Sequence, residues 1–260
     1  MSLRSQVASF RRSALSALAR RDVVIPSDRP LISFSFDDFP RTALTIGGSI
    51  LENAGVRGTY YVSPALIDTV NDLGPHFRKE DLVQLLAAGH ELANHTYSHL
   101  SARSTPCVDY GREVEKGYGT LTNTFGLDAS RHFAYPYGDI TLRVKSAVGS
   151  TMQSSRGIYP GLNGPRVDLN LLRANSLYGD VEQLGPAASL IAENRRKTYW
   201  LIFYTHDVRP NPSPYGCTPG LLEQVVKAAI ASGACIATVR EVVSLAESVR
   251  RPKQNSMERN

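Results

Sequence analysis

Short apolar runs alternate with amphipathic stretches along most of the chain. Apolar runs typical of buried strands cover 31–38, 58–63, 91–95, 132–135, 151–155, 171–177, 199–206 and 235–238. Apolar residues recur at helical spacing over 42–53, 79–88, 108–124, 140–147, 181–197, 221–231 and 239–249. This alternation predicts a mainly parallel sheet covered by helices. Seven or eight such units with no dividing linker favour a single α/β domain built as a barrel.

Loops and two terminal segments complete the predicted organisation. Loops are expected over 64–77, 157–168 and 209–219, the last being stiff because it contains four prolines. The chain is predicted to comprise a basic helical extension over 1–27, a catalytic barrel over 28–250 and a disordered tail over 251–260. Residues 1–21 are expected to form a helix on the outside of the domain, and contact with a membrane surface stays open.

Composition narrows the class of protein. With 42% hydrophobic residues among 260, the chain can bury a full core. The net charge of +5 comes largely from the two ends, so a nucleic-acid groove is not expected. No run is apolar and long enough to span a bilayer, and Arg11 and Arg12 interrupt the only signal-like stretch. Cys107, Cys217 and Cys235 have no metal or disulfide spacing, so reduced thiols and a cytoplasmic location are predicted.

Polar residues recur where the predicted strands end. Asp37, Asp38, His95, Tyr137 and His206 all lie at or just after the carboxyl ends of strands. In a βα barrel these ends share one face, where active sites form. We therefore expect residues far apart in the sequence to converge there.

The residue types at this face suit metal chemistry. Asp37 and Asp38 are adjacent, so their side chains point different ways, and one can bind a metal while the other acts as a base. Either could instead cap a helix. His95 and His99 are four residues apart, a spacing that presents two imidazoles to one zinc ion. A lone histidine such as His206 is more often a core or rim residue, but at this face it can act as a general acid.

Four motifs in this order resemble the polysaccharide deacetylases of carbohydrate esterase family 4. They are Ser35-Phe36-Asp37-Asp38, His95-Thr96-Tyr97-Ser98-His99, Phe133-Ala134-Tyr135-Pro136-Tyr137-Gly138 and Ile202-Phe203-Tyr204-Thr205-His206-Asp207. The third resembles in particular the deacetylases of exopolysaccharides linked through β-1,6-glucosamine. The motifs span about residues 31 to 240, and their joint order is far more specific than any one of them. The resemblance implies a distorted barrel of seven strands and metal-dependent N-deacetylation of acetamido sugars.

The resemblance also implies roles for single residues. Asp38, His95 and His99 would hold the metal, with zinc favoured and cobalt, nickel or iron left open. Asp37 would be the general base, and His206 would protonate the leaving amine. The backbone N–H of Tyr137 would stabilise the oxyanion.

The chain departs from the family pattern at Phe39-Pro40, where many members have Phe-Gly or Asp-Gly after the acidic pair, and in two residues of the predicted catalytic machinery. Ala134 stands where the third motif usually begins with an arginine that orients the base, and we hypothesise that Arg173 replaces it by pairing with Asp37. An aspartate that tunes the acid histidine is not evident, and Asp168 is the candidate. Leu201 or Phe203 is expected to line the pocket for the acetyl methyl group.

Three functional interpretations follow. The first is an N-deacetylase of an oligosaccharide, a lipid-linked intermediate or a nucleotide-linked sugar. The second keeps the fold but cleaves a cyclic amide or another C–N bond outside sugars, and the third is an inactive module that binds polysaccharide. The first is favoured because sugars stack on aromatic rings, and many tyrosines are candidates for the rim: Tyr61, Tyr97, Tyr135, Tyr159, Tyr178 and Tyr215. The oligomeric state is open.

Overall fold

A curled parallel sheet forms the centre of the protein. The computed structural model describes residues 15–250, with the backbone alone for 247–250. The strands of the sheet are β2 (Leu31–Asp37), β3 (Thr59–Val62), β6 (Glu91–Asn94), β7 (Ala129–Ala134), β8 (Ser154–Arg156), β10 (Asn175–Ser176), β11 (Trp200–Thr205) and β12 (Cys235–Ile236). Their order is β10–β11–β2–β3–β6–β7–β8, and β12 pairs with the start of β2. The prediction of one α/β domain with a distorted, seven-stranded barrel is confirmed.

The two outer strands of the sheet are β8 and β10, and the gap between them is called the seam. The seam makes the barrel irregular. A strand is predicted over 171–177, but only its last part forms β10 beside β11. Its first part meets β8 through a parallel bridge between Leu172 and Arg156, in which the N–H of Gly157 donates to the Leu172 carbonyl over 3.0 Å. A short antiparallel pair, β1 (Asp22–Val23) with β9 (Val167–Asp168), lies beyond this seam.

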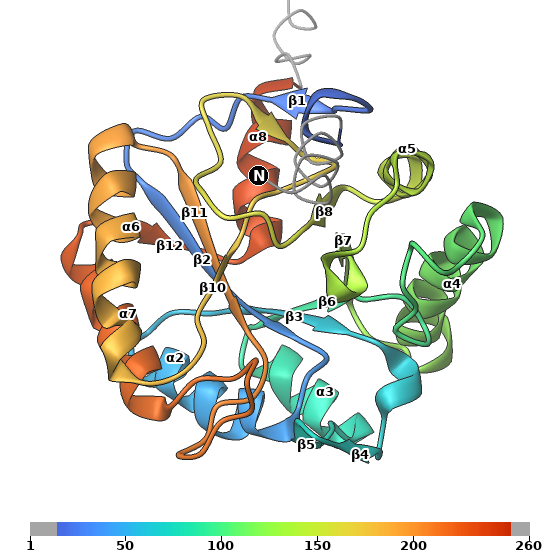
Figure 1. The fold of residues 1–260 in the computed structure, drawn as a ribbon, viewed down its shortest axis with the longest axis horizontal. Coiled ribbons are helices and arrows are strands. Elements are labelled where there is room, and N and C mark those ends of the chain that lie inside the picture. Colours follow the sequence, from blue (N-terminus) through green and yellow to red (C-terminus); the bar gives the residue numbers. More distant parts are fainter. Residues whose placement is uncertain (1–14, 251–260) are drawn as a thin grey trace, which may run out of the picture.

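Helices cover the sheet, most of them on its outer side, whereas α8 (Val239–Arg250) packs against inward-facing residues of β2 and β11 (Figure 1). They are α2 (Ser49–Asn53) after η1 (Ala43–Gly48), α3 (Lys79–Ala87), α4 (Cys107–Gly119) running into η3 (Thr120–Thr124), α5 (Leu142–Thr151), α6 (Leu184–Lys197) after η5 (Val181–Gln183), α7 (Pro219–Ala231) and α8. Local signals set their starts. Thr218 accepts a hydrogen bond from the N–H of Leu221, and Pro219 occupies the first turn of α7.

The apolar core lies mainly between the sheet and the helices. Its largest cluster includes Phe34, Phe36, Leu201 and Phe203, which face the outer helices. Inside the barrel, Trp200, Ile202 and Tyr204 of β11 pack with residues of α8. A separate small apolar cluster contains Tyr61, Ala93 and Ala134. Polar side chains therefore occupy much of the interior near the carboxyl ends of the strands.

The loops and ends contain structure that the sequence pattern does not predict. The predicted loop over 64–77 holds η2 (Pro64–Leu66) and a hairpin of β4 (Val70–Asn71) and β5 (Gly74–Pro75). Residues 15–23 of the predicted extension lie against the barrel, whereas 1–14 and the predicted tail over 251–260 fall outside the described residues. Among residues 15–250, every helix is too short or too polar to cross a membrane.

Candidate metal centre and active site

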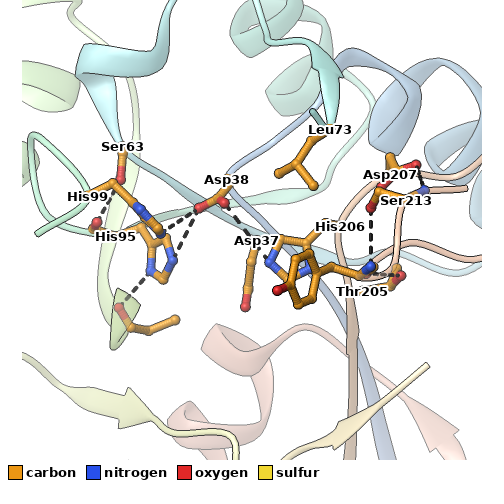
Figure 2. Close-up of polar contacts among 12 residues, drawn as sticks. Asp37, Asp38, Ser63, Leu73, His95, His99, Thr205, His206, Asp207 and Ser213 are labelled. Carbon is orange, nitrogen blue, oxygen red and sulfur yellow. Dashed lines mark hydrogen bonds and ion pairs between the residues drawn. The ribbon is translucent and has the colours of Figure 1, made fainter. Parts of the chain in front are cut away.

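Asp38, His95 and His99 meet at the carboxyl end of the sheet. Asp38 directly follows β2, His95 directly follows β6, and His99 lies in the turn after it. The Nε2 atoms of His95 and His99 lie 3.4 Å and 2.9 Å from Asp38 Oδ1. One ligand atom from each residue falls within 4.8 Å of the others. The structure therefore brings the three predicted ligands together (Figure 2).

The surroundings of His95 prepare it to bind a cation. Its Nδ1–H donates to the Ala134 carbonyl over 2.7 Å, which leaves Nε2 free to act as a ligand. The ring is buried, and this burial lowers the pKa of His95 to about 4. His95 is therefore neutral at pH 7, as a metal ligand must be.

Asp38 also fits a cation. Its Oδ1 is buried and accepts no well-oriented hydrogen bond from the described residues, although His99 lies close. Burial opposes ionisation of the carboxyl group, but the contact with His99 and the charges of His95 and His206 hold its pKa well below the usual range. A buried, ionised oxygen facing two imidazoles has the donor set that zinc prefers.

The backbone is strained around this cluster. Positive φ angles, which L-residues seldom adopt, occur at 61° in Asp38, 64° in Thr96, 55° in His99 and 59° in Tyr137. Such strain persists only where the surrounding structure holds it, and it concentrates at functional sites. The ring of Tyr137 packs edge-on against His99 with 4.5 Å between centroids, so the third motif directly adjoins the cluster.

Asp37 is held by an arginine that the sequence analysis did not identify. Arg156, at the end of β8, contacts both carboxylate oxygens of Asp37 through one Nη atom, with 2.6 Å to Oδ2. Its other Nη donates to the Gly157 carbonyl over 2.9 Å. The guanidinium lies between the rings of Tyr61 and Tyr204, with 5.0 Å and 4.8 Å to their centroids. This buried pair fixes the direction of the Asp37 carboxylate.

The predicted pairing of Arg173 with Asp37 is wrong. Arg173 is exposed, and its guanidinium donates to the Pro160 carbonyl over 3.0 Å. The usable signal lay in Ser154-Ser155-Arg156, a short extended segment that ends in an arginine before Gly157. Its last residue lies at the same strand-end face as Asp37.

His206 lies across the cluster from His95. Its Nε2 is 4.0 Å from Asp38 Oδ2, and its Nδ1 lies 3.1 Å from the Tyr215 carbonyl. Because a carbonyl only accepts, Nδ1 carries a proton, and Nε2 faces the site. Asp168 does not contact His206, so its proposed tuning role is wrong. Asp168 instead binds the buried Lys145 amine over 2.7 Å.

One cavity of about 730 Å³ is lined by Asp37, Asp38, His95, His99, Tyr137 and His206. Aromatic residues form much of its wall: Tyr135, Tyr137, Tyr178, Tyr204 and Tyr215. Of the tyrosines predicted for the rim, Tyr135, Tyr178 and Tyr215 line the cavity, whereas Tyr61, Tyr97 and Tyr159 do not. Leu201 and Phe203 face the helices instead, so the prediction that either lines an acetyl pocket is wrong.

Comparison with known proteins gives a family and a fold. The sequence model of the polysaccharide deacetylases matches residues 25–152, and no curated protein matches the chain. The structure is similar to a peptidoglycan deacetylase from Bacillus subtilis, with 15% identity, a TM-score of 0.54 and 86% of this chain and 94% of that chain covered.

Two xylan-related structures show the same fold. One is a family 4 acetyl xylan esterase from Clostridium thermocellum in complex with a cobalt ion, with 18% identity, a TM-score of 0.53 and coverage of 85% and 96%. The other is the Xyl-CE4 domain of a multidomain xylanase from the hindgut metagenome of Trinervitermes trinervoides, with 17% identity, a TM-score of 0.52 and coverage of 84% and 91%. The matched segment carries both the acidic pair and the histidine pair, and the barrel is the same. Residues 25–152 belong to the polysaccharide deacetylase family, and the described barrel has the fold of its members.

Proposed function

We propose that the protein is a metal-dependent hydrolase that removes N-acetyl groups from acetamido sugars of an oligosaccharide or polysaccharide. The observation that carries this proposal is the convergence of Asp38, His95 and His99 with Asp37 and His206 in one cavity. This arrangement combines three metal ligands with two groups that can move protons. Membership of the deacetylase family supports the same reaction.

Asp38, His95 and His99 would hold the divalent ion. We propose zinc because one carboxylate and two imidazoles suit it, while cobalt, nickel and iron remain alternatives. A structural neighbour with this fold carries cobalt. When bound, such an ion lowers the pKa of water and polarises a carbonyl group.

The residues around the ligands would move the protons. Asp37, oriented by Arg156, would accept a proton from the attacking water. His206, with its Nδ1–H bound to the Tyr215 carbonyl, would donate a proton from Nε2 to the leaving amine. The N–H of Tyr137 would stabilise the negative charge that develops on the amide oxygen.

The lining of the cavity supports a sugar substrate. Tyr137 and Tyr215 are exposed at its edge, by 63% and 56%, and offer ring faces or edges to a pyranose. A neighbour named as an acetyl xylan esterase makes an O-acetyl sugar the first alternative to test. A cyclic amide is the second, and a binding module without catalysis is the third.

Acetate release tests this proposal. The zinc-loaded protein is incubated with N-acetylglucosamine oligomers of several lengths and linkages, with acetylated xylan and with a cyclic amide. Replacement of a general base typically costs about 10²–10⁴-fold in rate, so Asp37→Asn should lower acetate release from the N-acetyl oligomers by that factor. Asp109→Asn is the matched control, because this aspartate is exposed on α4.

The other results would assign the protein differently. Acetate from xylan alone would make it an esterase, and turnover of the cyclic amide alone would place it outside sugar chemistry. Oligosaccharide binding without any hydrolysis would indicate a binding module. Acetate release that survives both Asp37→Asn and chelation would contradict the mechanism.

A further inference from the structure

Asp207 is a fully buried carboxylate next to His206 in sequence, yet it does not contact the His206 ring. Its Oδ2 accepts a hydrogen bond from the N–H of Ser213 over 2.9 Å and lies 2.7 Å from Arg209 Nε. Its Oδ1 accepts from the Ser213 hydroxyl. Figure 2 shows Asp207 and Ser213 together on the far side of His206 from the metal ligands. Asp207 therefore organises the segment that follows it, residues 208–217.

This segment folds back onto His206. The Cys217 N–H donates to the Asp207 carbonyl over 2.9 Å, and a β-carbon at Gly216 would lie only 2.4 Å from Asp207 Oδ1. The close turn brings the Tyr215 carbonyl to 3.2 Å from the backbone N of His206 and to 3.1 Å from its Nδ1. The orientation of the His206 ring thus depends on a loop carbonyl, and the loop depends on Asp207.

Arg209 links this loop to the opposite wall of the cavity. One of its Nη atoms donates to the Asp72 carbonyl over 3.2 Å, at the tip of the β4–β5 hairpin. A β-carbon at Gly74, whose φ is 100°, would lie 3.2 Å from the other Nη, so the guanidinium packs closely on the hairpin. The hairpin lines the cavity through residues 71–73, and the loop lines it through residues 213–215. Arg209 thereby joins both walls to one buried carboxylate.

We propose that Asp207 and Arg209 are positioning residues for the deacetylation proposed above. Asp207 holds the 208–217 loop so that the Tyr215 carbonyl orients His206 towards the leaving group. Arg209 fixes the position of the 70–75 hairpin relative to that loop. The cavity wall formed by the hairpin and the proposed acid His206 therefore move together. The ring of Tyr215 lies at the rim of the same loop, which couples sugar binding to the placement of the acid.

The proposal predicts a dependence on the leaving group. An amine must be protonated to leave, whereas the phenolate of an aryl acetate leaves without an acid. A misplaced His206 should therefore slow amide hydrolysis and spare the aryl ester. A displacement of about 1 Å at a reacting group can cost about 10²-fold.

The first test uses zinc-loaded Asp207→Asn and Ser213→Ala. For N-acetyl sugar, kcat should fall about tenfold to a hundredfold in Asp207→Asn and less in Ser213→Ala. The rate of aryl acetate hydrolysis in both variants should stay within about twofold of the wild-type rate. Each rate is corrected by subtracting the rate measured with Asp37→Asn. Asp109→Asn is the control for a lost carboxylate. Equal losses on both substrates, or no loss on either, would overturn the positioning role.

The second test needs no activity and so separates this proposal from the proposed function. Amide hydrogen exchange is compared between the wild type, Asp207→Asn, Arg209→Met and Arg112→Met, whose exposed arginine pairs with Asp109 on α4. Arg209→Met should speed exchange in both 70–75 and 208–217, and Asp207→Asn should speed it at the His206 amide. β2 and β11 should keep their protection in every variant. A hairpin that exchanges unchanged in Arg209→Met would refute the link, even if the protein hydrolyses none of the substrates.

Discussion

Arg156 shows how a single residue can determine the orientation of the proposed base, Asp37. The Arg156–Asp37 pair is buried, and the planar guanidinium lies over two tyrosine rings. Lysine carries the same charge, but its ammonium group is not planar and lacks the fixed, divergent N–H donors of a guanidinium. Arg156→Lys should therefore lower kcat for deacetylation by about 10²-fold through a misdirected Asp37.

Arg173 provides the matched control for this prediction. Its exposed guanidinium reaches only a backbone carbonyl among the contacts that the structure records, so Arg173→Lys should leave kcat close to the wild type. Steady-state kinetics of both variants, with circular dichroism to verify folding, measure the difference. A larger loss in Arg173→Lys than in Arg156→Lys would contradict the assignment.

His90 allows a prediction about pH at the opposite end of β6 from the proposed metal ligands. Its Nδ1 accepts a hydrogen bond from the Gly58 N–H over 3.0 Å, and its Nε2 lies 3.2 Å from Glu52. Burial lowers the pKa of His90 in the folded protein, whereas the same imidazole in the unfolded chain has a pKa of about 6.5. As the pH falls, His90 is therefore protonated in the unfolded chain before it is protonated in the folded protein. The contribution of neutral His90 to stability is complete above about pH 6.5 and is lost as pH falls through the lowered pKa.

Urea unfolding with chelator at pH 7.5, 6.5 and 5.5 measures this contribution. The free energy of unfolding should fall with acidification by at most about 1.4 kcal/mol per pH unit from this group. His90→Gln keeps a donor and an acceptor but does not titrate, so its free energy should fall less steeply. Parallel pH curves for the two proteins would show that His90 is not responsible.

At the scale of elements, helix α4 fixes the turn that carries both proposed histidine ligands. The Tyr97 N–H donates to the Glu113 carbonyl over 3.0 Å, and the Asn94 side chain donates to the Val114 carbonyl over 2.8 Å. The helix comes this close because residue 117 is glycine. A β-carbon there would lie 2.5 Å from Asn94 Oδ1 and 2.8 Å from the Thr96 carbonyl carbon.

Two glycines on α4 make a controlled pair. Gly117→Ala should cost about 1–3 kcal/mol by overpacking and should weaken zinc binding, because the His95 turn must shift. At Gly111 a β-carbon meets nothing within 4 Å, so Gly111→Ala should stabilise the protein by about 0.5–1 kcal/mol through helix propensity and leave zinc affinity unchanged. Chemical denaturation and zinc titration test both. Unchanged zinc affinity in Gly117→Ala would contradict the proposed role of this contact.

At the scale of the whole molecule, a buried lysine joins segments far apart in sequence. Lys145 on α5 is fully buried, and its amine donates to the carbonyls of Leu15 and Leu18 over 2.6 Å and 2.8 Å. The same amine binds Asp168 in β9 over 2.7 Å. These contacts attach the segment after residue 14 to the seam of the barrel.

Removal of this lysine should destabilise the entire domain. Lys145→Met leaves the Asp168 carboxylate buried without its partner, which typically costs about 3–5 kcal/mol. Lys197→Met is the control, because Lys197 is half exposed and pairs with Glu193 one helical turn away. Such a pair contributes about 0.3–0.5 kcal/mol. Urea unfolding measures both losses, and similar values would show that the buried network does not stabilise the seam.

The sequence by itself determined most of the elements and the face on which the proposed site lies, because both depend on local pattern. Strand periodicity and helix caps act over a few residues, and polar residues at parallel strand ends share one face whatever the exact register. Asp37, Asp38, His95 and His206 were placed at this face for this reason, whereas the choice of Asp38, His95 and His99 as metal ligands followed from the family resemblance and stays a prediction. The tertiary structure alone decided which distant side chains pair.

Arg156 rather than Arg173 binds Asp37 because the predicted strand over 171–177 is interrupted at the seam. The last residue of β8, Arg156, therefore reaches into the interior beside Asp37. His206 is oriented by the Tyr215 carbonyl because the loop closes around Asp207. Both outcomes depend on how irregular segments pack across the barrel, and no periodic pattern in the sequence encodes that packing.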